Sequence, residues 1–319
     1  MHILITGGAG FIGSHLADAL IEAGHDVRAL DILDPQVHGP ARSRPRHLHP
    51  AVELQRGDVR DEMAVTRALD GIEAVYHFAA AVGVGQSMYE VEHYTSTNSG
   101  GTAVLLQALV RRPVARLVVA SSMSLYGEGL YSRGDGTNVD DAERSLDHLR
   151  RGVWDVTDEG APLTPLPTPE HKRPRLSSVY ALSKYDQERL CLLIGAAYGI
   201  PTVALRFFNV FGPRQALSNP YTGVLAIFAS RLLNDRPPLI FEDGRQRRDF
   251  VSVHDVVQAC LRALDAPDAT GHAFNVGSGR SYAIADVAAL MASALDTPIE
   301  PTLTGEYRVG DIRHCFADI

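Results

Sequence analysis

A glycine-rich turn near the start of the chain constrains the fold more than any other stretch. Gly7, Gly10 and Gly13 follow the apolar run 2–6 directly, and residues 14–21 carry apolar side chains at helical spacing. This order predicts a strand, a tight turn and a helix. A backbone without side chains can lie against a pyrophosphate, and the helix N-terminus adds free N–H groups and the positive end of its dipole. The turn therefore predicts a dinucleotide-binding site.

The first half of the chain alternates strand-like and helix-like runs, which predicts a parallel sheet with helices on both faces. Residues 114–121 form a continuous apolar run, typical of a strand buried on both faces. We expect an α/β fold, in which a Rossmann-like, doubly wound parallel sheet is joined to a smaller C-terminal substrate-binding α/β domain. The dinucleotide-binding domain is expected over 1–206, with an insertion at 128–177. Residues 207–319 form mainly the substrate domain, except that 250–270 return to the first domain.

An acidic residue at the end of the second predicted strand indicates which dinucleotide binds. Asp31 ends the strand 25–31 and lies 18 residues beyond Gly13. A carboxylate there can accept hydrogen bonds from the adenosine ribose hydroxyls and repels a 2′-phosphate, so it favours NAD over NADP. Three arginines in the Pro- and His-rich loop 35–50 point the other way, namely Arg42, Arg44 and Arg46. We interpret that loop as solvated and expect NAD as the cofactor.

The composition excludes several functional classes. A formal net charge of -8 argues against a nucleic-acid partner. No apolar run approaches the ~20 residues that a membrane helix needs, so we expect no membrane partner. Cys191, Cys260 and Cys315 are scattered and odd in number, which is typical of reduced cytosolic thiols rather than of disulfides or a zinc site. We expect a cytoplasmic protein without a bound metal.

A tyrosine and a lysine one helical turn apart indicate acid–base chemistry. Tyr180 and Lys184 lie in the predicted helix 178–198, where residues i and i+4 share a face. A free phenol has a pKa near ~10, and an adjacent ammonium should lower it. The lysine can also hold the ribose hydroxyls of a nicotinamide nucleotide. Taken alone, this spacing is also common on exposed helices.

Serines at the end of the strand 114–121 add a third element. Ser121, Ser122 and Ser124 stand at the carboxyl edge of the predicted sheet, where α/β sheets bind ligands. A serine hydroxyl there can bind the same substrate oxygen as Tyr180. The alternative is an ordinary turn at the end of a strand.

Together these motifs resemble those of extended short-chain dehydrogenase/reductases, in the NAD-dependent sugar epimerase/dehydratase family. The resemblance covers nearly the whole chain. It also rests on several shorter motifs, which are Gly57-Asp58, His77-Phe78-Ala79-Ala80, Asn98 with Gly101-Thr102, the stretch 122–127, the stretch 206–213, the stretch 247–250 and Gly310-Asp311. In this family the catalytic Ser or Thr stands four residues before the Tyr of a Tyr-Gly pair. Counting back from Tyr126 selects Ser122.

The resemblance implies roles for individual residues. Ser122, Tyr180 and Lys184 are the implied catalytic residues. The implied cofactor contacts are Gly7, Gly10, Phe11, Ile12, Asp31, Asp58, Val59, Phe78, Ala79, Ala80, Asn98, Tyr180, Lys184 and Phe207. The implied substrate contacts are Ser122, Ser124, Tyr180, Asn209, Arg214, Ile240, Phe241, Arg248, Arg308 and Asp311.

Several of these substrate contacts have a specific implied function. Asn209 is similar to the residue that binds the sugar-proximal phosphate, and Arg248 and Arg308 resemble a clamp on the diphosphate. Ile240 and Phe241 stand where relatives pack the nucleotide base, although both could equally be core residues of a strand. Relatives dimerise by packing the helices 98–111 and 180–198 into a four-helix bundle, so the resemblance implies a homodimer.

The type of reaction follows from two residues that lack carboxylates. Dehydratases of the family carry Asp and Glu where this chain has Met123 and Ser124, neither of which replaces a carboxylate in proton transfer. This argues against 4,6-dehydration. We expect an NAD-dependent isomerase, a UDP-sugar 4-epimerase that works through a transient 4-keto sugar while the bound cofactor stores the hydride. The alternatives are UDP-glucuronate decarboxylation and a non-catalytic NAD-binding sensor, which the catalytic triad disfavours.

Two features leave alternatives open. Arg214 follows Pro213 near the expected sugar and can bind a C6 carboxylate, which favours UDP-glucuronate/UDP-galacturonate. The same Gly-Pro-Arg occurs in relatives that handle neutral sugars, so UDP-glucose/UDP-galactose is equally expected. The insertion 128–177 shows no clear periodicity over about fifty residues, and we expect either a substrate-covering flap or a disordered surface segment.

Overall fold

A computed structural model describes residues 1–217, 223–308 and 310–319 of the chain. A seven-stranded parallel sheet forms one half, with the strands in the order β15-β11-β5-β4-β1-β2-β3. The chain builds one side of β1 first and then crosses to β4, so the strand order reverses between β1 and β4. The strands are β1 (His2–Thr6), β2 (Asp26–Asp31), β3 (Glu53–Arg56), β4 (Ala74–His77), β5 (Arg116–Ser122), β11 (Thr202–Phe207) and β15 (Ala273–Val276).

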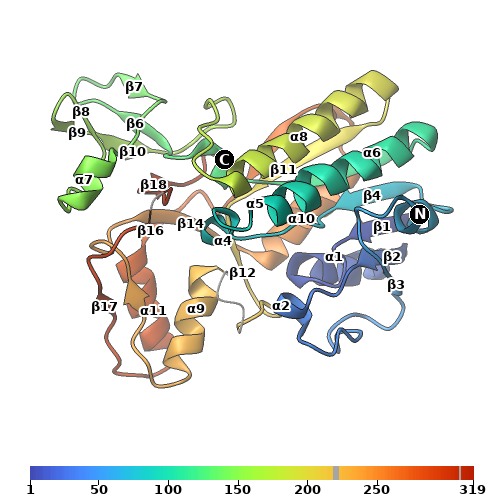
Figure 1. Ribbon diagram of the computed structural model, residues 1–319, viewed down its shortest axis with the longest axis horizontal. Helices are drawn as coiled ribbons and strands as arrows, with labels where there is room; N and C mark the ends of the chain where they lie inside the picture. Colours follow the sequence, from blue (N-terminus) through green and yellow to red (C-terminus); the bar gives the residue numbers. More distant parts are fainter. Residues whose placement is uncertain (218–222, 309) are drawn as a thin grey trace.

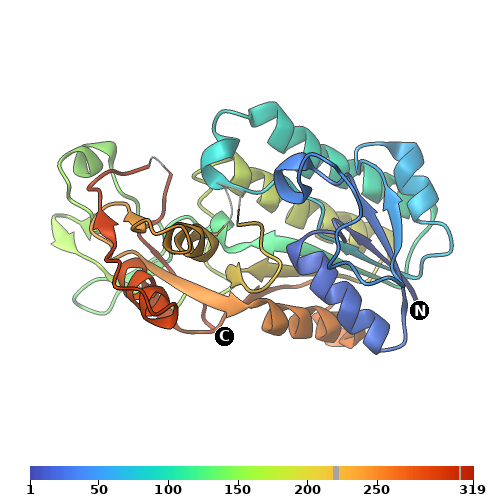
Figure 2. The ribbon, with the colours of Figure 1, turned by 90° about the horizontal axis from the view of Figure 1, so that it is seen from below.

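Helices cover both faces of this sheet (Figures 1 and 2). On one face, α1 (Phe11–Glu22) and α10 (Val253–Asp265) bury side chains such as Leu16 and Val256. On the other face lie α3 (Glu62–Ala68), α6 (Gly101–Arg111) and α8 (Val179–Tyr198). The expected Rossmann-like, doubly wound sheet is therefore confirmed. The return to this domain extends beyond the expected 250–270, because β15 adds an edge strand next to β11.

The helix that carries Tyr180 and Lys184 begins and ends on clear signals. Ser178 caps α8 by accepting a hydrogen bond from the N–H of Ala181. Gly199 ends it in the left-handed conformation, at φ +67°. The outer face of α8 leaves Leu182, Leu193 and Tyr198 exposed. The homodimer through α6 and α8 stays a prediction.

Short helical segments connect β2 to β3 and β4 to α6. They are α2 (Pro35–His38), α4 (Val84–Ser87), α5 (Val91–Tyr94) and a π-helical stretch (Thr95–Gly100) that runs directly into α6. A 3-10 turn (Met123–Tyr126) follows β5, and a second one (Pro267–Ala269) follows α10.

The second half of the molecule is a smaller α/β unit. Its strands are β12 (Asn209–Phe211), β14 (Arg247–Ser252), β16 (Ser281–Ala283) and β18 (His314–Cys315), with β13 (Leu239–Ile240) paired to β17 (Thr302–Leu303). Its helices are α9 (Val224–Leu232) and α11 (Ile284–Ala294). Ile240 is buried between these helices with Phe228 and Ala288. The prediction that Ile240 packs a nucleotide base is therefore wrong, and its alternative, a core residue, holds.

The insertion 128–177 is ordered, contrary to one of its two interpretations. It forms β6 (Leu130–Ser132), β7 (Asn138–Val139), α7 (Leu146–Arg150), β8 (Thr157–Asp158), β9 (Ala161–Pro162) and β10 (Thr164–Leu166), seen at the upper left of Figure 1. Its strands β10, β6 and β7 pair antiparallel. Trp154 of the insertion packs against Tyr307 of the C-terminal segment, with ring centroids 6.4 Å apart.

Buried charges join the insertion to the second unit. Arg144 of the insertion donates to Glu128, to Glu242 and to the backbone carbonyl of Asp311 at 3.2, 2.7 and 2.7 Å. Arg313 is fully buried and donates to Glu242 as well. Arg313 also pairs with Asp155 and Asp243, at 2.9 and 2.6 Å. The insertion is therefore fastened to the segment that precedes β18.

Candidate active site

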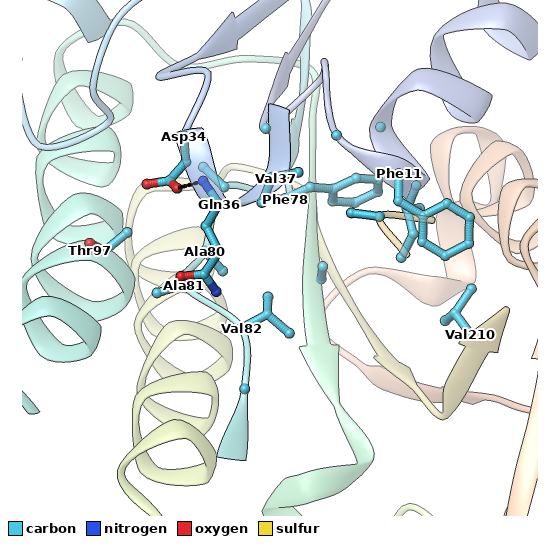
Figure 3. Close-up of a pocket in the computed structure, with 18 of the residues that line it drawn as sticks. Phe11, Asp34, Gln36, Val37, Phe78, Ala80, Ala81, Val82, Thr97 and Val210 are labelled. Carbon is cyan, nitrogen blue, oxygen red and sulfur yellow. Dashed lines mark hydrogen bonds between the residues drawn. The ribbon is translucent and has the colours of Figure 1, made fainter. Parts of the chain in front are cut away.

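A pocket of about 640 Å³ lies at the carboxyl ends of β1, β4, β5 and β11. Figure 3 shows Phe11 and Val210 at one end of it, Gln36, Ala81 and Thr97 at the other, and Phe78 between them. This is the edge where the strand order reverses, and parallel sheets bind ligands at such a place. No residue of the insertion 128–177 is among the described residues that line it. The interpretation of the insertion as a flap over the substrate is therefore not supported at this pocket.

The glycine turn has the close packing that a dinucleotide cradle requires. Gly7 has φ +72°, and a Cβ there would lie 2.9 Å from the backbone nitrogen of Ala79. A Cβ on Gly13 would lie 2.5 Å from the carbonyl oxygen of Gly7. Both contacts are with backbone, which cannot give way as a flexible side chain could. The turn therefore brings bare backbone and the start of α1 to the pocket, as NAD requires.

Asp31 is oriented by the turn itself. Its Oδ2 accepts the N–H of Ala9 at 3.0 Å, and its Oδ1 accepts the N–H of Leu33 at 2.8 Å. His38 Nε2 lies 3.7 Å from Oδ1. The carboxylate lines the pocket with lone pairs left for ribose hydroxyls. Arg44 is one of the three arginines that could have favoured NADP. It donates to the backbone carbonyl of His49 at 2.6 Å, so its guanidinium stabilises the loop.

The structure brings the predicted cofactor contacts together with one exception. The residues that line the pocket are Gly7, Gly10, Phe11, Ile12, Asp31, Asp58, Val59, Phe78, Ala79, Ala80, Tyr180, Lys184 and Phe207. Asn98 is fully buried instead. Its side chain accepts the N–H of Ala81 and donates to the Ala81 carbonyl and to Ser183, at 2.7, 3.0 and 2.9 Å. Asn98 therefore holds the turn after β4 against α8, and its prediction as a direct contact is wrong.

The three catalytic candidates face the same pocket from β5 and α8. Ser122 ends β5, and its hydroxyl accepts the N–H of Ser124 at 3.1 Å. Tyr180 and Lys184 lie one turn apart on α8. The neighbouring Ser121 donates to Glu188 at 2.6 Å, so its hydroxyl is engaged in the interior. This arrangement favours Ser122 over Ser121, as predicted.

Burial dominates the acid–base properties of this pair. Desolvation raises the pKa of Tyr180, while a hydrogen bond with Ser122 acts to lower it. Desolvation lowers the pKa of Lys184 to about 8, against smaller contributions from Cys191 and Glu188 that raise it. The expectation that the lysine depresses the tyrosine pKa in the protein alone is therefore wrong, because burial disfavours the charged form of both groups.

One residue of this site was not predicted. Lys184 Nζ donates to the side-chain carbonyl of Gln187 at 2.6 Å. Gln187 is fully buried, three residues further along α8. The i, i+3 spacing was the available signal, since residues so spaced share a helix face. A neutral side chain carries no chemistry by itself, which is why its role becomes visible only with its partners.

The substrate candidates of the second unit fall into two groups. Asn209 and Arg214 line the pocket. Asn209 donates to the carbonyl of Asp249 at 2.9 Å, which fixes its amide at the pocket wall. Ser124 is buried, and its hydroxyl has no hydrogen-bond partner among the described residues.

Arg214 forms an ion pair with a carboxylate of α1. Its Nη2 donates to Asp18 at 2.7 Å, and its backbone adopts φ +69°. The Asp18 side chain is 25% exposed and that of Arg214 is 24% exposed, so the ion pair is partly desolvated. Arg214 is therefore engaged by a carboxylate of the protein beside the glycine turn. The buried Nη1 of Arg214 has no hydrogen-bond partner among the described residues, so the contact with a C6 carboxylate stays a prediction.

A second group lies outside this pocket, where β14 and the residue after β13 meet the segment before β18. Arg248 donates to the carbonyls of Arg247 and Arg313 at 2.9 and 3.0 Å and also to that of Ile312. The Arg308 guanidinium stacks over the Phe241 ring, 4.1 Å from its centroid. Burial raises the pKa of Asp311, and the charges of Arg248 and Arg308 act to lower it. These groups are adjacent, as predicted, but each is engaged within the protein.

No group of three or more His, Cys, Asp or Glu side chains in the described ranges could hold a metal ion. Within those ranges, no helix combines the length and the apolar character needed to cross a membrane.

Comparisons with known proteins agree with this geometry. The model of the "NAD dependent epimerase/dehydratase family" matches residues 3–146 and 157–277. A dTDP-L-rhamnose 4-epimerase from Burkholderia thailandensis is 36% identical over 323 residues, which cover 99% of this chain and 87% of that protein.

Solved structures of relatives superimpose over the full chain. A UDP-glucose 4-epimerase from Thermotoga maritima, crystallised with UDP-glucose, has a TM-score of 0.80 and 30% identity, covering 100% of this chain and 90% of that one. The Thermus thermophilus UDP-glucose 4-epimerase in complex with NAD has a TM-score of 0.79 and 30% identity, with the same coverage.

Proposed function

Since the chain belongs to the NAD-dependent epimerase/dehydratase family and is an NAD-dependent nucleotide-sugar epimerase of the extended short-chain dehydrogenase/reductase type, we propose that it inverts C4 of a UDP-sugar. The observation that carries the proposal is the meeting of Ser122, Tyr180 and Lys184 in one pocket beside the glycine cradle. Bound NAD supplies a reversible hydride acceptor for C4 of the sugar.

Tyr180 and its neighbours then carry out the proton transfers. The Tyr180 phenolate takes the proton of the sugar 4-hydroxyl and returns it after the sugar has turned its other face. Ser122 bridges the same oxygen, and its hydrogen bond acts to lower the Tyr180 pKa. Lys184, one helical turn further on, holds the ribose hydroxyls of the nicotinamide nucleotide. Neither Met123 nor Ser124 can serve as the carboxylate that water elimination needs. The 4-keto sugar is therefore reduced again and not dehydrated.

The sugar is proposed to have an uncharged C6. The cation beside Pro213 is Arg214, and the carboxylate of Asp18 already balances its charge. This favours UDP-glucose/UDP-galactose over UDP-glucuronate/UDP-galacturonate and also argues against decarboxylation. The relative from Burkholderia thailandensis acts on a dTDP-sugar, so a dTDP-hexose is the second candidate. The two bases differ by a single methyl group.

A panel of nucleotide sugars tests this proposal. The purified protein is incubated separately with UDP-glucose, UDP-galactose, UDP-glucuronate, UDP-galacturonate and dTDP-hexoses, and the products are separated and identified. We expect C4 epimers of a neutral sugar. A pentose product with released CO₂ would replace epimerisation by decarboxylation, and a panel without any turnover would favour the sensor.

Tyr180→Phe is the matching variant. Removal of the hydroxyl should lower kcat by about 100- to 10,000-fold, the usual contribution of a positioned acid–base group. The NAD content of the purified protein should stay unchanged. Tyr198→Phe, at the exposed end of the same helix, is the control and should retain full activity. An active Tyr180→Phe protein would disprove the assignment of the base.

A further inference from the structure

A chain of buried polar side chains runs from Lys184 to the turn that borders the cofactor pocket. It connects Gln187 of α8, Thr102 of α6, His77 of β4 and Thr6 of β1, all of which are fully buried. These residues come from four elements of the Rossmann-like half and are far apart in sequence. Buried polar groups need complete hydrogen bonding, so the direction of each bond can be worked out.

The direction of the chain begins at Thr6. Its hydroxyl accepts the backbone N–H groups of Phe78 and Ala79 at 3.2 and 3.1 Å, so its own proton points to His77 Nδ1 at 2.8 Å. Nδ1 is then the acceptor of the ring, and Nε2 carries the hydrogen. Burial, with the charge of Lys184, lowers the pKa of His77 to about 3, so the ring remains neutral.

Thr102 receives that hydrogen and fixes the Gln187 amide. The Thr102 hydroxyl donates to the carbonyl of Asn98 at 2.6 Å, so it accepts from His77 Nε2 at 2.8 Å. Gln187 Nε2 is its second donor, at 2.9 Å. Gln187 Nε2 and His77 Nε2 lie 3.3 Å apart as two donors to one oxygen, which is a contact and not a further hydrogen bond.

The amide of Gln187 can therefore face Lys184 only with its carbonyl. A flipped amide would point its NH₂ group at the ammonium and its oxygen at a hydroxyl whose proton is already used. In the observed orientation, Gln187 Oε1 accepts from Lys184 Nζ at 2.6 Å. An ammonium has three donors, so two remain for the pocket.

The acceptor is neutral, which leaves the charge of Lys184 available. The adjacent Glu188 is engaged elsewhere, because Arg206 donates to both of its carboxylate oxygens at 2.6 and 2.9 Å. The titratable groups around Lys184 are His77 from β4 and Tyr180, Glu188 and Cys191 from α8.

We propose that Gln187 is a positioning residue for Lys184, and that the Thr6–His77–Thr102 chain sets the direction in which its carbonyl holds the ammonium. The role rests on the proposed function of Tyr180 and Lys184. Gln187 stabilises the charged amine inside the protein without neutralising it. The same chain bonds the backbone of Phe78 and Ala79, so the position of the lysine is tied to a wall of the cofactor pocket.

The chain contains two lysines, Lys172 and Lys184, which permits a direct measurement. Protein labelled with carbon-13 at the lysine ε-position is titrated with its bound NAD and followed by NMR. Only two signals are present, and a Lys172→Arg variant identifies that of Lys184. No substrate is needed, so the result does not depend on which sugar is turned over.

Two substitutions of equal size should move the midpoint of this titration in opposite directions. Gln187→Met removes the acceptor and should lower it by about one pH unit, while Gln187→Glu adds a compensating carboxylate and should raise it by about one pH unit or more. The alkaline limb of the pH profile of kcat should move in the same direction as the Lys184 midpoint. Gln258→Glu adds the same charge at an exposed site of α10 and should move neither.

Thr102→Val provides a test that leaves Gln187 in place. It removes the acceptor of the Gln187 NH₂ group, so the amide loses its orientation and the Lys184 midpoint should fall, by less than in Gln187→Met. Unchanged Lys184 titrations in the folded variants would overturn the proposal and leave Gln187 a packing residue. If the variants show the predicted shifts of the Lys184 midpoint but the protein epimerises no sugar, only the proposed function is refuted.

Discussion

At the scale of single residues, the position of Lys184 depends on the neutral Gln187 side chain that accepts its hydrogen bond. Tyr180 and Lys184 were predicted from their spacing on a helix, and the resemblance to the family selected Ser122 among the serines at the end of the strand. The Gln187 carbonyl acts only because Thr102 orients it from another helix. Arg214 likewise meets Asp18 across 196 positions of sequence, a pairing that only the tertiary structure creates.

Replacing Arg214 tests its reassignment. If Arg214 serves Asp18 and the glycine turn, Arg214→Ala should reduce the affinity for uronate and neutral UDP-sugars by the same factor. Binding constants for both sugar pairs provide the measurement, whichever pair is turned over. Asp18→Asn, which removes the other half of the ion pair, is the matched variant and should behave in the same way. Selective loss of uronate binding by more than about tenfold, equal to 1.4 kcal/mol, would restore the carboxylate contact.

At the scale of elements, periodicity and turn chemistry predicted the parallel sheet and its helices. The strand ending at Asp31, the buried strand before Ser122 and the long helix of Tyr180 all appear at the expected places. Periodicity did not predict the elements of the insertion, because its strands span two or three residues. Such short strands are held by neighbours and not by a repeating pattern of their own.

The glycine turn supports a prediction with a built-in control. Gly7 and Gly24 both have positive φ, +72° and +82°, but only Gly7 has backbone atoms around its missing side chain. Gly24→Ala should therefore lower the free energy of unfolding by about 1 kcal/mol, the cost of the left-handed backbone alone.

Gly7→Ala should lower that free energy further and should also release NAD, because the new methyl group pushes against Ala79 at the pocket wall. Thermal unfolding and the NAD content of the purified proteins provide the two measurements. Equal losses of stability in both variants, with NAD retained in Gly7→Ala, would contradict the role of close packing.

At the scale of the whole molecule, the insertion packs against the second unit, although it interrupts the first unit in the sequence. Two buried arginines, Arg144 and Arg313, are shared among the carboxylates of Glu128, Asp155 and Glu242. Neither composition nor spacing indicated these contacts. Charged residues in an irregular stretch normally indicate a solvated surface, and here they are buried by a segment more than 150 positions away.

Arg144→Met should be severely destabilising. It leaves Glu128 and Glu242 buried without their shared cation, and breaking such a pair typically costs about 3–5 kcal/mol. Urea unfolding measures this loss. Arg133→Met is the control within the same insertion, since Arg133 pairs with Asp158 at the surface and salt screens such pairs. A similar unfolding midpoint for both variants would show that the buried network contributes little.

The packing of Trp154 on Tyr307 has an optical consequence. The chain contains one tryptophan, so its intrinsic emission arises at the seam between the insertion and the C-terminal segment. Indole emission shifts to longer wavelength when the ring becomes hydrated. The colour of this emission therefore reports whether the seam is closed, independently of the fate of the parallel sheet.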